Sequence, residues 1–225
     1  MKKSIRLKKG FSLVELMVVV FVLTIIMGGS FMVMSSGQAA WFLTDVNIRL
    51  EENLRLAFNR LTRELAETGL DERIPLNPIL QLTILGNAGV NGSDILRFSM
   101  PVVCQNNVTV IDPNGYVAYW GAPLTWGCSS SSCMDADNDC ATVDYKYLEY
   151  SIDNSNRLMR RVLDSNNVLV TAPEGETVVA RNITDLQANP YSNNEIVTLT
   201  MTARAMSATN RLITTSKSVD VRLRN

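Results

Sequence analysis

The residue types that most often perform catalysis are missing from this sequence or scattered along it. Its 225 residues include no histidine, which excludes histidine-based triads, zinc sites with histidine ligands and imidazole pH switches. A hydrolase without histidine needs a serine–lysine pair, a carboxylate pair or a metal, and no motif gathers such residues. The segment Gly86-Asn-Ala-Gly89 lacks the lysine that completes a phosphate-binding loop. We therefore expect that the chain is not an enzyme.

The four cysteines are the residues with the clearest covalent chemistry. Cys104, Cys128, Cys133 and Cys140 lie together near the middle of the chain. An even number of cysteines in one stretch favours disulfides formed in an oxidising compartment. A four-cysteine zinc site would need C-x2-C pairs, which are missing here. Three connectivities are open, and the short loops favour Cys104–Cys128 with Cys133–Cys140.

Three carboxylates stand at alternate positions between the last two cysteines. Asp135, Asp137 and Asp139 could present oxygen atoms to Ca²⁺, which takes 6–8 oxygen ligands. The EF-hand pattern fails because its glycine at position 6 and its glutamate at position 12 are missing. The sequence favours an acidic loop that faces solvent. We expect no cofactor, with calcium at these aspartates as the alternative.

The charge is distributed unevenly. Lys and Arg together number 21 and Asp and Glu 22. The first ten residues hold no acid and five basic residues, namely Lys2, Lys3, Arg6, Lys8 and Lys9. The rest of the chain is therefore acidic. Because phosphate contacts need concentrated positive charge, we expect no nucleic-acid partner.

An apolar run follows the basic cluster. Residues 11–34 carry one charge, Glu15, and about 20 apolar residues are enough to cross a bilayer. By the positive-inside rule the N-terminus stays cytoplasmic and the rest is exported. The run is too long for an ordinary signal peptide and no A-x-A follows it. A lone carboxylate in hydrocarbon costs about 2.5–3.5 kcal/mol, so Glu15 is expected to have a partner and a function.

The segment from Lys8 to Leu16, KKGFSLVEL, resembles the class III leader of type IV prepilins. The resemblance implies that prepilin peptidase cuts after Gly10 and that Phe11 becomes the N-methylated new N-terminus. Glu15 corresponds to the characteristic acidic residue of the family. In a staggered bundle of such helices, Glu15 can pair with the Phe11 amine of a neighbour, which relieves two desolvated charges and fixes the axial register.

A long helix is predicted to carry this segment. Beyond the apolar run, apolar residues recur in steps of three and four, at positions 43, 46, 50, 54, 57, 61 and 65, which describes one face of a helix. Gly69, Pro75 and Pro78 predict its end. We expect a helix of roughly 57 residues from Ser12, with Gly28-Gly29 tolerated inside it.

The periodicity changes to that of strands after residue 75. Predicted strands cover 79–85, 94–103, 108–111, 116–120, 143–152, 157–163, 177–183, 195–205 and 217–223. An amphipathic helix against an antiparallel sheet makes an α+β fold. The expected segments are a cleaved leader (1–10), a transmembrane or filament-core helix (11–38), an amphipathic helix (39–70) and an exported β-rich domain (71–225).

Most of the chain also resembles one branch of the same family. The helix end LTRELAETGL and the hairpin from Tyr147 to Arg161 are similar to those of large minor pilins and J-type pseudopilins. The resemblance implies a low-copy subunit of a type IV pilus or type II secretion filament, acting in initiation or at the tip. It also implies other major and minor pilins or pseudopilins, prepilin peptidase and an inner-membrane assembly platform as partners.

The same resemblance implies a location. The chain would be a single-pass protein of the bacterial inner membrane with its C-terminal domain in the periplasm, and part of a pilus or pseudopilus after assembly. The alternative is a bitopic membrane protein whose exported domain binds a ligand or has an undetected enzymatic activity.

Overall fold

The computed structural model describes residues 12–71, 79–102, 116–117, 119–124, 144–172, 174–190 and 195–224. The chain divides into two compact units, Met1–Asp45 and Val46–Asn225. We call them the first and the second unit.

One helix, α1 (Leu13–Ala66), runs through the boundary between the units. It begins where the amides of Glu15 and Leu16 donate to the carbonyl oxygen of Ser12, at 3.0 and 3.2 Å. Its 54 residues agree with the predicted helix of roughly 57. The helix continues through Gly28 and Gly29, as the sequence predicts.

The predicted apolar face of α1 is confirmed in the second unit. Its side chains at 50, 54, 57, 61 and 65 are buried, and Val46 packs at the edge of the same core. The spacing explains this result, because steps of three and four return to one side of a helix. Phe58, beside the stripe, is buried as well.

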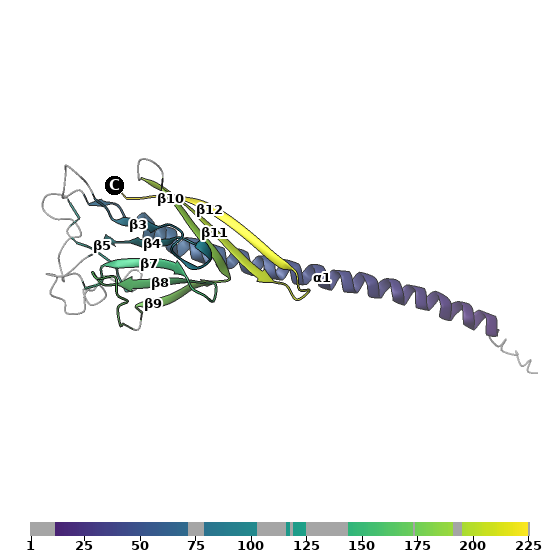
Figure 1. The fold of residues 1–225 in the computed structure, drawn as a ribbon. Coiled ribbons are helices and arrows are strands. Elements are labelled where there is room, and N and C mark those ends of the chain that lie inside the picture. Colours follow the sequence, from purple (N-terminus) through teal and green to yellow (C-terminus); the bar gives the residue numbers. More distant parts are fainter. Residues whose placement is uncertain are drawn as a thin grey trace, which may run out of the picture. The chain divides into compact units, whose positions relative to one another are not determined.

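The larger sheet of the second unit has five antiparallel strands in the order β3-β4-β7-β8-β9 (Figure 1). Their bounds are β3 (Leu82–Leu85), β4 (Ile95–Phe98), β7 (Tyr147–Ile152), β8 (Arg157–Leu163) and β9 (Glu176–Arg181). β7 and β8 form the predicted hairpin, with Tyr147 opposite Leu163. Leu96, Leu148, Leu158 and Val162 from this sheet join the core beside α1.

The second sheet has three antiparallel strands in the order β10-β11-β12. They are β10 (Ile183–Pro190), β11 (Ile196–Met206) and β12 (Leu212–Arg222). Two short pairs join β1 (Leu70–Asp71) to β2 (Ile79–Leu80) and β5 (Met100–Pro101) to β6 (Trp120–Gly121), and a 3₁₀ turn, η1, covers Val90–Gly92. The inner positions of β11 alternate strictly, so Val197, Leu199 and Met201 are all buried.

Some strand boundaries differ from the prediction. The predicted strand 177–183 ends at Arg181, and a new strand begins at Ile183 and belongs to the other sheet. Asn182, with φ 62°, turns the chain between them, and asparagine is enriched in this left-handed conformation. The predicted strand 108–111 lies outside the described residues.

The predicted α+β fold class is confirmed. The second-unit part of α1 and the two antiparallel sheets share one hydrophobic core. This architecture, with a long apolar N-terminal helix and antiparallel sheets, matches the type IV pilin fold.

Candidate functional site

The first turn of α1 carries the one charged side chain between Leu13 and Thr44, that of Glu15. Glu15 is exposed, as are Leu13, Val14 and Leu16 around it. Large apolar side chains stay exposed along the helix as far as Met34. Water is a poor solvent for such a surface, which needs lipid or other apolar helices around it.

The described residues contain one helix, α1, that is long and apolar enough to cross a membrane. Of the residues that the sequence assigns to processing and assembly, Glu15 is described, whereas Gly10 and Phe11 lie outside the described residues. The four cysteines (Cys104, Cys128, Cys133 and Cys140) and the three aspartates (Asp135, Asp137 and Asp139) lie outside them too. Their disulfide and calcium assignments stay predictions.

The second unit contains a buried ionic cluster that was not predicted from the sequence. Glu64 on α1 and Arg160 on β8 are both fully buried, and the Arg160 Nε lies 3.0 Å from each carboxylate oxygen of Glu64. The hydroxyl of Tyr150 on β7 donates to Glu64 Oε2 at 2.7 Å. Burial, together with the negative charge of Glu64, raises the pKa of Tyr150 well above 10.0.

Arg160 also holds a segment beside the sheet. Its two terminal nitrogens donate to the carbonyl oxygens of Pro123 at 2.6 Å and Leu124 at 2.8 Å. Arg60, one helical turn before Glu64, adds a longer contact of 3.3 Å. The cluster therefore ties α1, β7, β8 and residues 123–124 together, and its charges compensate one another inside the core.

Two sequence signals could have revealed this cluster. Glu64 follows Ala57 by seven positions and Leu61 by three, so it belongs to the apolar face of α1. Arg160 stands between Leu158 and Val162 on the inward-facing side of β8. A charged residue at an inward position of each element indicates a buried pair, although sequence alone does not reveal which charges meet.

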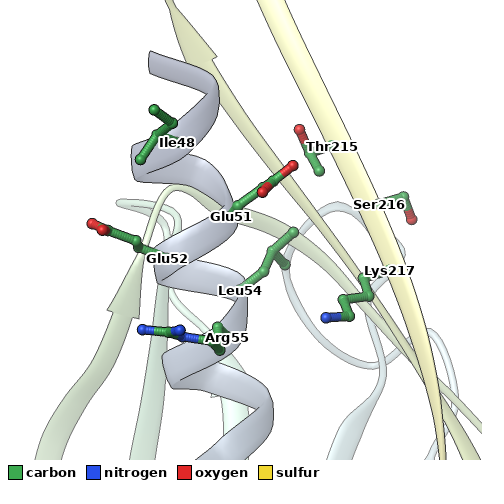
Figure 2. A pocket seen from close by; sticks show the side chains of 8 residues that line it. All are labelled: Ile48, Glu51, Glu52, Leu54, Arg55, Thr215, Ser216 and Lys217. Carbon is green, nitrogen blue, oxygen red and sulfur yellow. The ribbon is translucent and has the colours of Figure 1, made fainter. Parts of the chain in front are cut away.

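A groove lies between α1 and β12 within the second unit (Figure 2). It has a volume of about 420 Å³. Its lining consists of Ile48, Glu51, Glu52, Leu54, Arg55, Thr215, Ser216 and Lys217. Figure 2 shows acidic and basic side chains from α1 around it, and the basic side chain of Lys217 from β12. The lining contains no recognisable catalytic arrangement.

Comparison with known proteins agrees with the N-terminal features. Residues 5–31 match the model of the prokaryotic N-terminal methylation motif. Neither a curated protein nor a solved structure matches the chain. The motif covers residues 5–10 of the basic leader and the exposed apolar start of α1, which holds Glu15. The chain thus carries a class III prepilin leader that continues into a long apolar helix, and together with the fold these features are consistent with a type IV pilin-like protein.

Proposed function

We propose that this protein is a structural, non-enzymatic minor pilin or pseudopilin of a type IV pilus or type II secretion filament. One observation carries the proposal: the methylation motif overlaps the exposed apolar part of α1, where Glu15 is the one charged residue between Leu13 and Thr44. Such a helix can span the membrane before assembly and form the core of a filament afterwards. The subunit would act in filament initiation or at the tip.

The assembly step depends on two charges. Cleavage after Gly10 gives Phe11 a cationic amine one helical turn from Glu15. A neighbouring subunit shifted along the filament axis brings its own amine to this carboxylate, so that each charge loses water but gains a partner. Prepilin peptidase and other pilins are therefore the proposed partners, together with an inner-membrane assembly platform.

The minor role is supported by the second unit. Two sheets of five and three strands pack against α1 in this unit. Such a unit is large for a subunit that repeats along a filament shaft. A low-copy subunit can present it at the tip. We place the unit in the periplasm because the basic residues before the span keep the N-terminus cytoplasmic.

Export also supports the predicted disulfides. In an oxidising compartment Cys104, Cys128, Cys133 and Cys140 would form two bridges, each contributing about 2–4 kcal/mol of stability. Thiol quantification on protein from the cell envelope tests this, and four free thiols would contradict it.

The test of the assembly mechanism is Glu15→Ala. The variant should be cleaved and inserted normally, because the change removes a carboxylate that is costly in hydrocarbon. It should lose copurification with its partner pilins after detergent extraction, because their Phe11 amine has no counter-charge. Glu174→Ala, which removes an exposed carboxylate outside α1, is the matched control. Equal recovery of partners with Glu15→Ala would show that this residue does not direct assembly.

A second measurement separates the proposal from the alternative of a bitopic anchor with a ligand-binding or enzymatic domain. Mass spectrometry of the mature chain should find N-methylated Phe11. An N-terminus that still begins with Met1 would support the anchor.

A further inference from the structure

The turn between β11 and β12 ends in an exposed apolar pair. Met206 and Leu212 are cross-strand partners, and they are 54% and 61% exposed. The turn is ordered, because the amide of Ser207 donates to the carbonyl oxygen of Arg211 at 2.8 Å and that of Asn210 to Ser207 at 2.9 Å. We call Arg204, Met206, Arg211 and Leu212 the hairpin tip.

The hairpin is basic in an otherwise acidic exported region. From Ile196 to Val219 the sequence has Arg204, Arg211 and Lys217 and no acidic residue. Both arginines of the tip are exposed, and among the described residues neither side chain has an ion-pair partner. The tip therefore offers two free cations beside an apolar pair.

The direction of β12 gives the position of the tip within the second unit. The hydroxyl of Thr215 donates to the Asn47 side chain at 3.1 Å, and the amide of Arg224 donates to the carbonyl oxygen of Thr68 at 2.8 Å. The strand covers about 30 Å between these two contacts, and the helix covers about 31 Å. β12 and α1 thus run side by side in the same direction here, as Figure 1 shows.

The tip consequently extends past Asn47, where the part of α1 that lies beside β12 begins. Leu212 precedes Thr215 by three strand residues, or about 10 Å. It lies beyond Asn47, at the end of the second unit where the chain arrives from the apolar segment. Between Met34 and Asn47, the large apolar side chains that are exposed are those of Trp41 and Phe42. From Met34 to Asn47 the chain is helical and covers at most about 20 Å.

We propose that, before assembly, the hairpin tip docks on the anionic lipid surface of the membrane from which α1 emerges. Arg204 and Arg211 would bind lipid phosphates, and Met206 and Leu212 would enter the headgroup region. Basic side chains bind anionic surfaces, and apolar side chains add binding at the interface. The inference rests on the membrane-anchored state in the proposed function. It adds a second membrane contact, which would hold the β-rich unit in one orientation until the subunit is extracted into a filament.

The test uses the full-length chain in vesicles that contain phosphatidylglycerol with a photoactivatable diazirine near the top of its acyl chain. After illumination and proteolysis, mass spectrometry measures lipid adducts on peptides that cover 205–217. The internal control is peptide 162–181, which holds Val168, a residue 59% exposed in another turn. We expect more lipid adducts on 205–217 than on this control peptide. We expect the adducts on 205–217 to be lost in vesicles in which phosphatidylcholine is the only lipid besides a small amount of the probe.

Two variants test the two parts of the tip. Arg204→Glu with Arg211→Glu should reduce labelling of the hairpin by at least about fivefold, since one basic residue near an anionic surface contributes roughly that factor. Met206→Ser with Leu212→Ser should reduce it too. Arg222→Glu, at the far end of β12 and exposed, should leave it unchanged.

Labelling of the α1 span itself separates this inference from the proposed function. A labelled span with a hairpin no more labelled than 162–181 would overturn the docking proposal and leave the membrane anchor intact. An unlabelled span would overturn both. If the arginine variant loses its partner pilins while the wild-type hairpin stays unlabelled, the tip is a protein-binding surface and the lipid proposal is wrong.

Discussion

Replacing Arg160 with methionine should strongly destabilise the second unit. Its guanidinium is fully buried and makes two contacts of 3.0 Å to Glu64 and two hydrogen bonds to the carbonyl oxygens of Pro123 and Leu124. Removing one partner of a buried pair costs about 3–5 kcal/mol because the other charge stays behind. Whole domains are stable by about 5–15 kcal/mol, so this is a large share.

The double variant separates charge from packing. Glu64→Met with Arg160→Met removes both charges, and such replacements are often neutral or stabilising. Here the Tyr150 hydroxyl and the two carbonyl oxygens lose their partners, at about 1–3 kcal/mol for each group left unsatisfied. These hydrogen bonds are lost whether the two changes are made singly or together. Only the single changes leave an unpaired charge in the core, so the double variant should cost less than the two single changes added together.

Guanidinium unfolding of the full-length chain in detergent, followed by near-UV circular dichroism, measures these free energies. Arg161→Met is the matched control, since the next residue of β8 is partly exposed and pairs with Glu176 at 2.8 Å. Partly exposed pairs contribute about 0–1 kcal/mol. If Arg160→Met costs no more than Arg161→Met, the buried cluster does not hold the helix to the sheet.

Three further outcomes are expected. Gly69→Ala should cost about 1–3 kcal/mol in the same unfolding assay, because a Cβ there would overlap the carbonyl oxygen of Arg224. Gly86→Ala, whose Cβ meets only an ordinary contact, should change stability by less than about 0.5 kcal/mol. Since the folded-state pKa of Tyr150 is raised above 10.0, the free energy of unfolding should hold up to about pH 10 and fall above it. Tyr150→Phe should reduce this fall, as measured by thermal melts at a series of pH values. An unchanged dependence of stability on pH would show that Tyr150 does not cause the fall. Gly10→Val should leave the uncleaved precursor in the membrane on immunoblots, and normal cleavage would remove the main support for a prepilin leader.

Features set by local spacing could be read from the sequence. The extent of α1, its buried stripe from Leu50 to Leu65 and the β7–β8 hairpin all depend on residues close together in the chain. The leader and Glu15 could be recognised for the same reason, because the basic cluster, the Gly10–Phe11 junction and the acid stand at fixed spacing. Hydrophobic periods of 3.6 and 2 report which face of an element is buried.

Which distant residues meet depends on long-range packing. Glu64 and Arg160 form a pair because α1 and β8 pack in one core, and nothing local joins them. Gly69 follows the end of α1 at Ala66, and the need for glycine there comes from the backbone of Arg224, brought beside it by the last strand. The change of sheet after Asn182 also depends on pairing, since β10 takes β11 as its partner. The sequence determined the helix, its apolar surface and the processing motif, whereas long-range packing decided where the buried charges meet and where the hairpin tip lies.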